Sequence, residues 1–220
     1  MICRIDCGKF WAIQNHKVLF ITKLSLAKLY LNVTPSLNPA PASFISPCMP
    51  QIHVSPLADL DSTIARIAPS HVVSLLSPSM PEPAAGSIGR AHYLRIDVND
   101  IASAADGLIL AEAEHVEQIL GFVRDWPQAQ PLLMHCWFGV SRSPAAAYVA
   151  ACALAPDHDE AALAGALRQA APFATPNRRI VALGDALLAR EGRMSAAIEA
   201  IGRGCEVSTG VPFVMDFPPR

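Results

Sequence analysis

The chain has 220 residues, of which 52% are hydrophobic and 16% charged, a balance that excludes disorder throughout and suits one domain with or without an appendage. Its 17 basic and 19 acidic residues give a formal charge of −2, whereas a dedicated nucleic-acid binder normally carries a basic surplus. No apolar run reaches the roughly 18 residues of a membrane span, so the sequence predicts no integral membrane association.

Residues 1–48 differ in composition from the rest of the chain. All four lysines lie there: Lys9, Lys17, Lys23 and Lys28. The stretch 16–33 can be interpreted as a basic, weakly amphipathic helix that contacts a membrane or a partner. A Pro/Ser-rich stretch follows it. We favour the alternative that residues 1–48 are an extension, either disordered or not native, and that a compact domain occupies residues 49–203.

From residue 49 onward, short apolar runs alternate with stretches of helical periodicity. Strands are predicted at 51–54, 71–77, 93–98 and 131–135. Helices are predicted at 55–69, with Ser55 as the N-cap, and at 110–126 and 144–155. Two or three more helices follow, at roughly 159–171, 177–190 and 192–202. This alternation predicts an α/β fold, a three-layer sandwich with a short, mainly parallel central sheet flanked by helices, followed by a tail at 204–220.

The cysteines do not form the pattern of a disulfide framework. After residue 49 only Cys136, Cys152 and Cys205 remain, which is an odd number. There is no CxxC pair and no His/Cys cluster at zinc spacing, so no metal site is expected. We therefore expect the protein to be located in the reducing cytoplasm.

The chemistry is concentrated in HCWFGVSRS, residues 135–143, between a predicted strand and a predicted helix. A tight loop there can turn successive backbone N–H groups around one point, where they form an anion site with the helix dipole. Cys136 would place its sulfur in the floor of that site, where the amides stabilise a thiolate. Arg142 can bind two phosphate oxygens, and Gly139 tolerates positive φ. The pattern predicts in-line attack of a thiolate on phosphorus.

Such a reaction needs a proton for the leaving oxygen. Asp100 is favoured as the donor because it lies on the loop side of the predicted strand 93–98; Asp97, within the strand, is the alternative. Either aspartate can equally be a solvated or helix-capping residue. Ser143 can direct its hydroxyl at the sulfur, or cap the following helix. His135 either tunes the thiolate or satisfies a buried backbone group.

These residues resemble the signature loop of the cysteine-dependent protein tyrosine phosphatase superfamily. YLRIDVND (93–100) and ALRQAAPFATPNRRIVALGD (166–185), with Pro176 and Asn177 leading its second helix, are similar to the compact, bacterial-type dual-specificity branch. The resemblance covers about residues 71–190 and implies a phosphotyrosine phosphatase-like fold with no metal or organic cofactor. The roles that it implies are Cys136 as nucleophile, Arg142 as phosphate clamp, Asp100 as general acid and then base, Ser143 as helper in breakdown of the phosphocysteine, and Trp137, Phe138, Gly139, Val140, Ser141 and Arg142 as the phosphate-binding loop.

Two loop positions depart from the family pattern. Trp137 and Phe138 stand where family members often carry polar or charged residues, and lysines are common there in members that take polyphosphorylated inositol rings. The two apolar rings would form a hydrophobic rim that disfavours a highly charged ligand and can lie against an aryl leaving group; alternatively, they pack beneath the loop. No long tyrosine-recognition insertion is present, so a shallow cleft that also accepts phosphoserine or phosphothreonine is expected.

Two other classes of protein share parts of this pattern. One is a non-catalytic phosphate- or phosphopeptide-binding module, and the other is a sulfurtransferase or arsenate-reductase-type enzyme. Retention of Cys136, Arg142 and a candidate acid favours a phosphomonoester hydrolase whose partner is a phosphorylated protein or a small aryl phosphate. A reductase would need a nearby resolving cysteine, whereas Cys152, about four helical turns further on, is expected to be a small buried residue.

Overall fold

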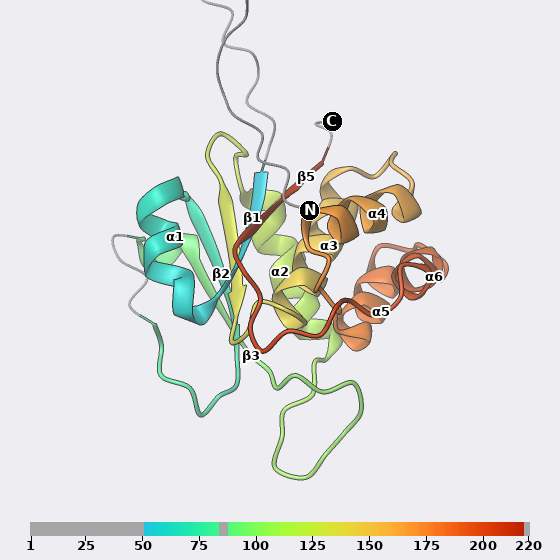
Figure 1. The fold of residues 1–220 in the computed structure, drawn as a ribbon, viewed down its shortest axis with the longest axis horizontal. Helices are drawn as coiled ribbons and strands as arrows, with labels where there is room; N and C mark the ends of the chain where they lie inside the picture. The colour runs from blue at the N-terminus through green and yellow to red at the C-terminus, as the bar shows by residue number, and fades with distance from the viewer. Residues whose placement is uncertain (1–50, 84–87, 218–220) are drawn as a thin grey trace, which may run out of the picture. The chain divides into compact units, whose positions relative to one another are not determined.

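The computed structural model describes residues 51–83 and 88–217, which form a five-stranded sheet with helices on both faces (Figure 1). The strands are β1 (Gln51–Pro56), β2 (His71–Leu76), β3 (Tyr93–Asp97), β4 (Leu132–Cys136) and β5 (Phe213–Asp216), in the order β3-β2-β4-β1-β5. The first four strands run parallel and β5 is antiparallel to β1. The expected α/β fold with a mainly parallel sheet is confirmed.

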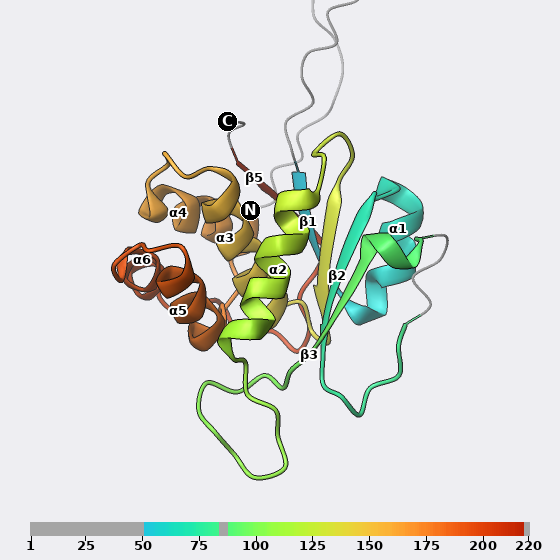
Figure 2. The ribbon, with the colours of Figure 1, turned by 180° about the vertical axis from the view of Figure 1, so that it is seen from behind.

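One α-helix covers one face of the sheet, and the other α-helices of the described residues lie on the opposite side (Figure 2). The first face carries α1 (Leu60–Ile67). The second carries α2 (Ala113–Asp125), α3 (Arg142–Leu154), α4 (Glu160–Ala170), α5 (Arg178–Leu187) and α6 (Arg193–Ala200). Every residue of α3 is buried, as expected of a helix that is apolar on all sides. These three layers agree with the predicted sandwich.

Successive side chains of a strand point to opposite faces of the sheet, and helices cover both faces, so both sets of side chains are buried. Val72 and Leu133, paired across β2 and β4, form a small cluster with Leu60 of α1. Val73 and Met134, one residue further along each strand, lie in the larger core with the helices of the other face. Burial on both sides explains why these strands read as continuous apolar runs.

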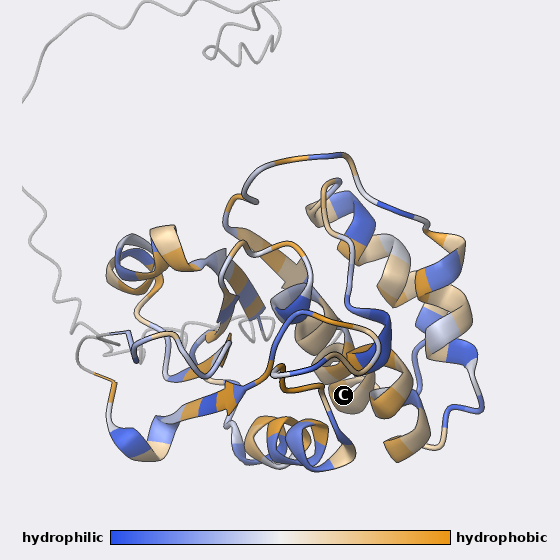
Figure 3. Cartoon of the chain, turned by 90° about the horizontal axis from the view of Figure 1, so that it is seen from below, coloured by the Kyte–Doolittle hydropathy of each residue, from blue (hydrophilic) through white to orange (hydrophobic). Residues whose placement is uncertain are grey.

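The loops that follow the parallel strands lie together at one end of the sheet. The loop after β3 (98–112), the loop after β4 (137–141) and the segment 201–212 before β5 all reach this end, which Figure 3 views directly. Loops at the carboxyl ends of parallel strands are the usual place for ligand sites in such folds.

The predicted start of the first helix is wrong. Ser55 lies within β1, opposite His135 of β4, and its hydroxyl donates to the carbonyl of Pro56. A short 3₁₀ turn (Leu57–Asp59) follows the strand, and Asp59 is the N-cap of α1. Ser55 is in a strand because β1 is a central strand whose ladder with β4 continues to Pro56.

The prediction of an irregular tail at 204–220 is also wrong. β5 adds an antiparallel edge to β1, and Met215 and Phe217 are buried. A strand of four residues is too short to give a readable period, and its pairing partner lies far away in the sequence. The compact part of the chain therefore extends past residue 203. The prediction for residues 1–48 lies outside the described residues.

Among the described residues, no helix combines the length and the apolar composition that crossing a membrane requires. The remaining helices lie where the periodicity predicted them, with ends shifted by a few residues. The largest of these shifts are at the N-terminus of α2, which begins at Ala113, and at the C-terminus of α5, which ends at Leu187.

Candidate active site

The loop 137–141 is held from outside by its carbonyl oxygens. Four of them accept hydrogen bonds from backbone N–H groups of other segments: Trp137 from Leu57 (3.2 Å), Phe138 from Gly210 (2.9 Å), Val140 from Thr175 (2.9 Å) and Ser141 from Asn177 (3.2 Å). The donors come from the turn after β1, the segment before β5 and the segment that leads into α5. Three distant parts of the chain thus fix this loop.

The backbone N–H groups of the same loop point the other way. In a trans peptide the carbonyl and the following N–H are opposed, and no peptide bond is cis in the described residues. Because these carbonyls point outward, the N–H group that follows each of them points inward. These N–H groups belong to Phe138, Gly139, Ser141 and Arg142. Within residues 51–83 and 88–217, the N–H groups of residues 137–141 donate no hydrogen bond. This arrangement is an anion-binding nest at the N-terminus of α3.

Gly139 is required by the shape of the loop. Its φ of 67° is in the left-handed region, and a Cβ at this position would approach the backbone nitrogen of Pro56 to 2.8 Å. Glycine alone meets both conditions without strain. The observed φ agrees with the expectation that Gly139 gives the loop a residue that tolerates positive φ.

Cys136 lies at the base of this nest. It is the last residue of β4, flanked in the sheet by Pro56 of β1 and Leu75 of β2, and it is buried. The Ser143 hydroxyl donates a hydrogen bond to its sulfur at 3.1 Å. Ser141 is the N-cap residue of α3, so the alternative that Ser143 caps this helix is wrong. A hydroxyl on the sulfur stabilises negative charge there.

Arg142, the first residue of α3, is buried although it carries a charge. Its Nη1 donates to the carbonyl of Val98, the residue directly after β3, at 2.8 Å. Its Nε is buried and makes no hydrogen bond to the described residues. A buried guanidinium with donors to spare, at the same helix terminus as the nest, is suited to bind an anion.

Asp100 lies where the loop after β3 meets the nest. Its Oδ1 accepts hydrogen bonds from the Ser141 hydroxyl (2.7 Å) and from the side-chain amide of Asn177 (2.9 Å). Both bonds end on the same oxygen, which leaves Oδ2 without a hydrogen bond to the described residues. The two hydrogen bonds to Oδ1 hold the carboxyl group in place, while Oδ2 remains available to carry a proton.

Asp97 is placed differently. It is the last residue of β3, and its carboxylate is half exposed and paired with Arg95 Nε at 2.8 Å on its own strand. Among the described residues, no hydrogen bond or ion pair joins it to the loop 137–141. The structure therefore brings Asp100 to the nest, and it does not bring Asp97 there.

His135 is fully buried in β4, beside the nucleophile candidate. Burial, together with the positive charges of Arg95 and Arg142, lowers the pKa of His135 to about 4, so the ring is neutral at physiological pH. Neither ring nitrogen makes a hydrogen bond within the described part of the chain. The alternative that His135 hydrogen-bonds a buried backbone group is therefore wrong.

Asn177 is a site residue to which the sequence analysis gave no role. It is the N-cap of α5, and its side-chain oxygen accepts from the N–H groups of Arg179 and Ile180. Its side-chain amide donates to Asp100, and its backbone N–H donates to Ser141. The Pro-Asn pair that leads the predicted helix was the one sequence signal for this residue. One residue, through its side chain and its backbone N–H, thus joins α5, the Asp100 loop and the nest.

Trp137 and Phe138 form an exposed rim beside the nest. The two residues are 39% and 48% exposed, and their rings meet edge to face with centroids 6.1 Å apart. Both rings lie at the surface, so the alternative that they pack beneath the loop is wrong.

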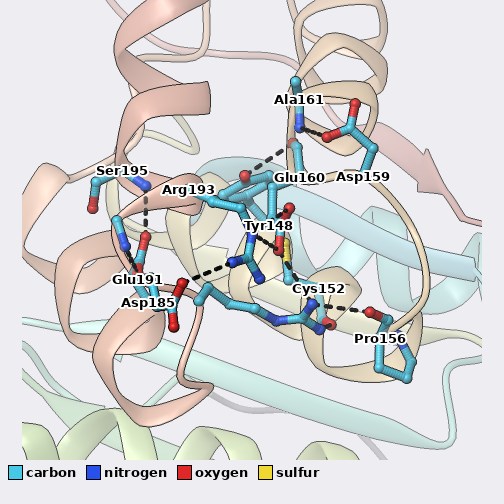
Figure 4. Close-up of polar contacts among 12 residues, drawn as sticks. Tyr148, Cys152, Pro156, Asp159, Glu160, Ala161, Asp185, Glu191, Arg193 and Ser195 are labelled. Carbon is cyan, nitrogen blue, oxygen red and sulfur yellow. Dashed lines mark hydrogen bonds and ion pairs between the residues drawn. The ribbon is translucent and has the colours of Figure 1, made fainter.

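Cys152 lies in a separate polar cluster between α3, α4, α5 and α6 (Figure 4). Burial is the main cause that raises the pKa of Cys152 to about 12. The Tyr148 hydroxyl on the same helix donates to the backbone carbonyl of Glu160. Cys152 is thus a buried, protonated thiol, which does not fit a resolving cysteine. Across the described residues, no group of three or more His, Cys, Asp or Glu side chains could hold a metal ion.

Comparison with known proteins adds information at the level of the fold. Neither a protein-family model nor a curated protein sequence matches the chain. Among solved structures, DUSP15 matches with a TM-score of 0.50 at 18% identity, over 69% of this chain and 92% of that chain. Human DUSP28 matches with a TM-score of 0.44 at 21% identity, over 63% of this chain and 94% of that chain. A mouse putative dual specificity phosphatase matches with a TM-score of 0.40 at 22% identity, over 64% of this chain and 79% of that chain.

The likeness to DUSP15 agrees with the resemblance of the signature loop. It covers about two thirds of this chain and nearly all of the compared chain. The chain has the fold of the dual-specificity branch of the cysteine-dependent protein tyrosine phosphatase superfamily.

Proposed function

We propose that this protein is a phosphomonoester hydrolase that forms a phosphocysteine intermediate on Cys136. Its substrates are phosphotyrosine and related phosphates on proteins, with small aryl phosphates as artificial substrates. The observation that carries this proposal is the nest of inward N–H groups beside Cys136, at the terminus where Arg142 is buried. We further propose that it acts in the cytoplasm, whose reducing conditions preserve a nucleophilic thiol.

In the first step, the Cys136 thiolate attacks phosphorus in line with the bond to the leaving oxygen. The S–P bond forms, the P–O bond breaks, and Asp100 gives its proton to the leaving oxygen. The N–H groups of the nest and the Arg142 guanidinium bind the three equatorial oxygens, whose charge is held without reorganisation of the protein.

In the second step, water attacks the phosphocysteine. Asp100, now ionised, accepts a proton from this water, the O–P bond forms and the S–P bond breaks. Ser143 is already hydrogen-bonded to the sulfur, so its hydroxyl stabilises the departing thiolate. Inorganic phosphate leaves, and Asp100 has its proton again for the next cycle.

Turnover of p-nitrophenyl phosphate tests this proposal. Cys136→Ser should lose at least about a thousandfold in kcat while still binding phosphate, because the nest and Arg142 remain. Cys152→Ser is the matched control, since this thiol lies outside the site, and it should retain turnover. Phosphate binding without turnover by the wild-type protein would favour the binding-module alternative. Undiminished hydrolysis by Cys136→Ser would reject the mechanism.

A further inference from the structure

The exposed large hydrophobic side chains of the described residues are not spread over the surface. There are six of them: Leu108, Ile109, Trp137, Phe138, Val207 and Val211. All six lie in the loops at the carboxyl end of the sheet, and Figure 3 shows hydrophobic stretches in the loops at this end. Clustered apolar exposure of this kind marks an interaction site, whereas scattered single residues need no explanation.

These side chains belong to three segments, all of which contribute to the candidate active site. Leu108 and Ile109 belong to the loop that carries Asp100, and this loop is braced by the hydrogen bond from the Ile109 N–H to the Asn99 side chain. Val207 and Val211 belong to the segment 201–212, which donates from Gly210 to the carbonyl of Phe138. The exposed apolar side chains are therefore carried by the same segments that build the candidate active site.

A groove of about 320 Å³ opens within this surface, next to the nest. It is lined by Leu57, Ala58, Trp137, Phe138 and Thr209. Its walls are fixed, because Leu57 donates to the carbonyl of Trp137 and Gly210 donates to that of Phe138. A preformed apolar groove binds an apolar side chain at a low cost in ordering its own residues.

The position of the groove suits a residue close to the phosphorylated one. Trp137 and Phe138 follow Cys136 directly in the chain, and consecutive Cα atoms are about 3.8 Å apart. A side chain one to three positions from the phosphorylated residue of an extended peptide would reach the groove while the phosphate lies in the nest.

Charge also favours apolar over acidic neighbours of the phosphorylated residue. Acidic residues outnumber arginines in the sequence from 51 to 217, which contains no lysine. No basic side chain lines the groove itself. An acidic peptide would find no partner for its carboxylates there and would be repelled by the domain as a whole. The same charge disfavours an anionic lipid surface.

Building on the proposed function, we propose that this groove binds an apolar side chain of the substrate. The protein would then select phosphorylated protein segments in which the phosphorylated residue is flanked by apolar rather than acidic residues. The specificity would lie in the groove beside the phosphate loop, while the nest and Arg142 bind the phosphate common to all substrates.

The test uses phosphotyrosine peptides of one length that differ only in their flanking residues, which are leucine, serine or glutamate. We expect kcat/KM to be about tenfold or more higher for the leucine peptide than for the glutamate peptide. Ala58→Glu, which places a carboxylate in the groove, should remove this preference, and Ala58→Arg should shift it toward the glutamate peptide. Ala162→Glu, on the exposed side of α4, is the matched control and should keep the preference.

Two further measurements separate this inference from the proposed function. Hydrolysis of p-nitrophenyl phosphate, which has no flanking residue, tests the function alone, and binding of labelled peptides to Cys136→Ser tests the groove without turnover. Equal kcat/KM for all peptides, together with hydrolysis of p-nitrophenyl phosphate, would overturn the inference and leave the function standing. Faster hydrolysis of a phosphoinositide in anionic vesicles than of every peptide would also overturn it. Selective binding of the leucine peptide without any hydrolysis would support the groove and reject the function.

Discussion

The side-chain amide of Asn177 donates a hydrogen bond to Oδ1 of Asp100 at 2.9 Å, across 77 positions of sequence. The same side chain caps α5 through its oxygen, and its backbone N–H holds the carbonyl of Ser141. Asn177 is thus the residue through which the candidate acid and the phosphate-binding loop are held in one geometry.

Asn177→Ala should therefore lower turnover and stability together. Loss of the cap costs about 1 kcal/mol of unfolding free energy, and a displaced Asp100 costs about tenfold or more in kcat. The fall in kcat should be larger for substrates with poor leaving groups, because those depend most on a proton from Asp100. A series of aryl phosphates of graded leaving-group acidity measures this dependence.

Two control variants separate the roles of Asn177. Asn177→Ser keeps a side-chain oxygen to cap α5 but has no amide to donate to Asp100, so it should retain more stability than Asn177→Ala and still lose turnover. Asp159→Ala removes the side-chain cap of α4, outside the site, and should lower stability with turnover intact. Equal kcat for wild type and Asn177→Ser would show that Asn177 acts only as a cap.

Asp100→Asn should lower kcat by about 10²–10⁴-fold for alkyl or poorly activated aryl phosphates, because the leaving oxygen then departs without a proton. The loss should be smallest for p-nitrophenyl phosphate, whose leaving group is stable as an anion. Asp97→Asn is the matched control, since Asp97 pairs with Arg95 away from the nest. A uniform loss across all leaving groups would count against Asp100 as the acid.

Ser143→Ala should slow the second step more than the first. Its hydroxyl is hydrogen-bonded to the Cys136 sulfur, which must leave as a thiolate when water attacks. Stopped-flow measurement of p-nitrophenol release should then show a rapid burst followed by a slow steady state. A steady-state rate equal to that of the wild type would mean that the hydroxyl has no part in breakdown of the intermediate.

The polar cluster of Figure 4 should govern stability in acid, independently of the site. Burial raises the pKa of Glu160, but hydrogen bonds from its own backbone N–H and from Arg193, with the charges of Arg193 and Arg190, hold it below the ordinary value of 4.5. Since the folded-state pKa is lowered, this stabilisation is present above pH 4.5 and is lost as pH falls through the lowered value.

Glu160→Gln should cost about 2 kcal/mol of unfolding free energy at pH 7, and the cost should shrink as pH falls through the lowered pKa of Glu160, where the wild type loses the charge as well. Urea unfolding at several pH values measures the free energy of unfolding of the wild type and of Glu160→Gln. Glu114→Gln is the control, because Glu114, in the first turn of α2, forms no ion pair within the described residues. Its substitution should cost less free energy than Glu160→Gln. A cost of Glu160→Gln that is the same at every pH would contradict the role of its charge.

Reasoning from sequence succeeded where the chemistry is local in the chain. The segment 135–143 is contiguous, so the strand end, the loop and the helix start bring Cys136, Gly139, Arg142 and Ser143 together in one turn. Asp100 could be chosen over Asp97 because it lies just past a strand end, which places it at the loop end of the sheet.

The sequence did not predict those features that depend on pairing between distant parts of the chain. Ser55 suits a helix N-cap by type, but the ladder between β1 and β4 keeps it in a strand. β5 is four residues long, and only its pairing with β1 defines it. The bond from Asn177 to Asp100 joins two loops that no sequence period connects. Tertiary contacts of this kind override local propensity.

The phosphocysteine itself offers the most direct test of the account. The wild-type protein is mixed with excess p-nitrophenyl phosphate, quenched in acid during the steady state and mapped by mass spectrometry. The account predicts one phosphoryl group, attached to Cys136, at a higher occupancy in Ser143→Ala and absent in Cys136→Ser. Hydrolysis that proceeds with no phosphoryl group on Cys136, or with one on another residue, would contradict it.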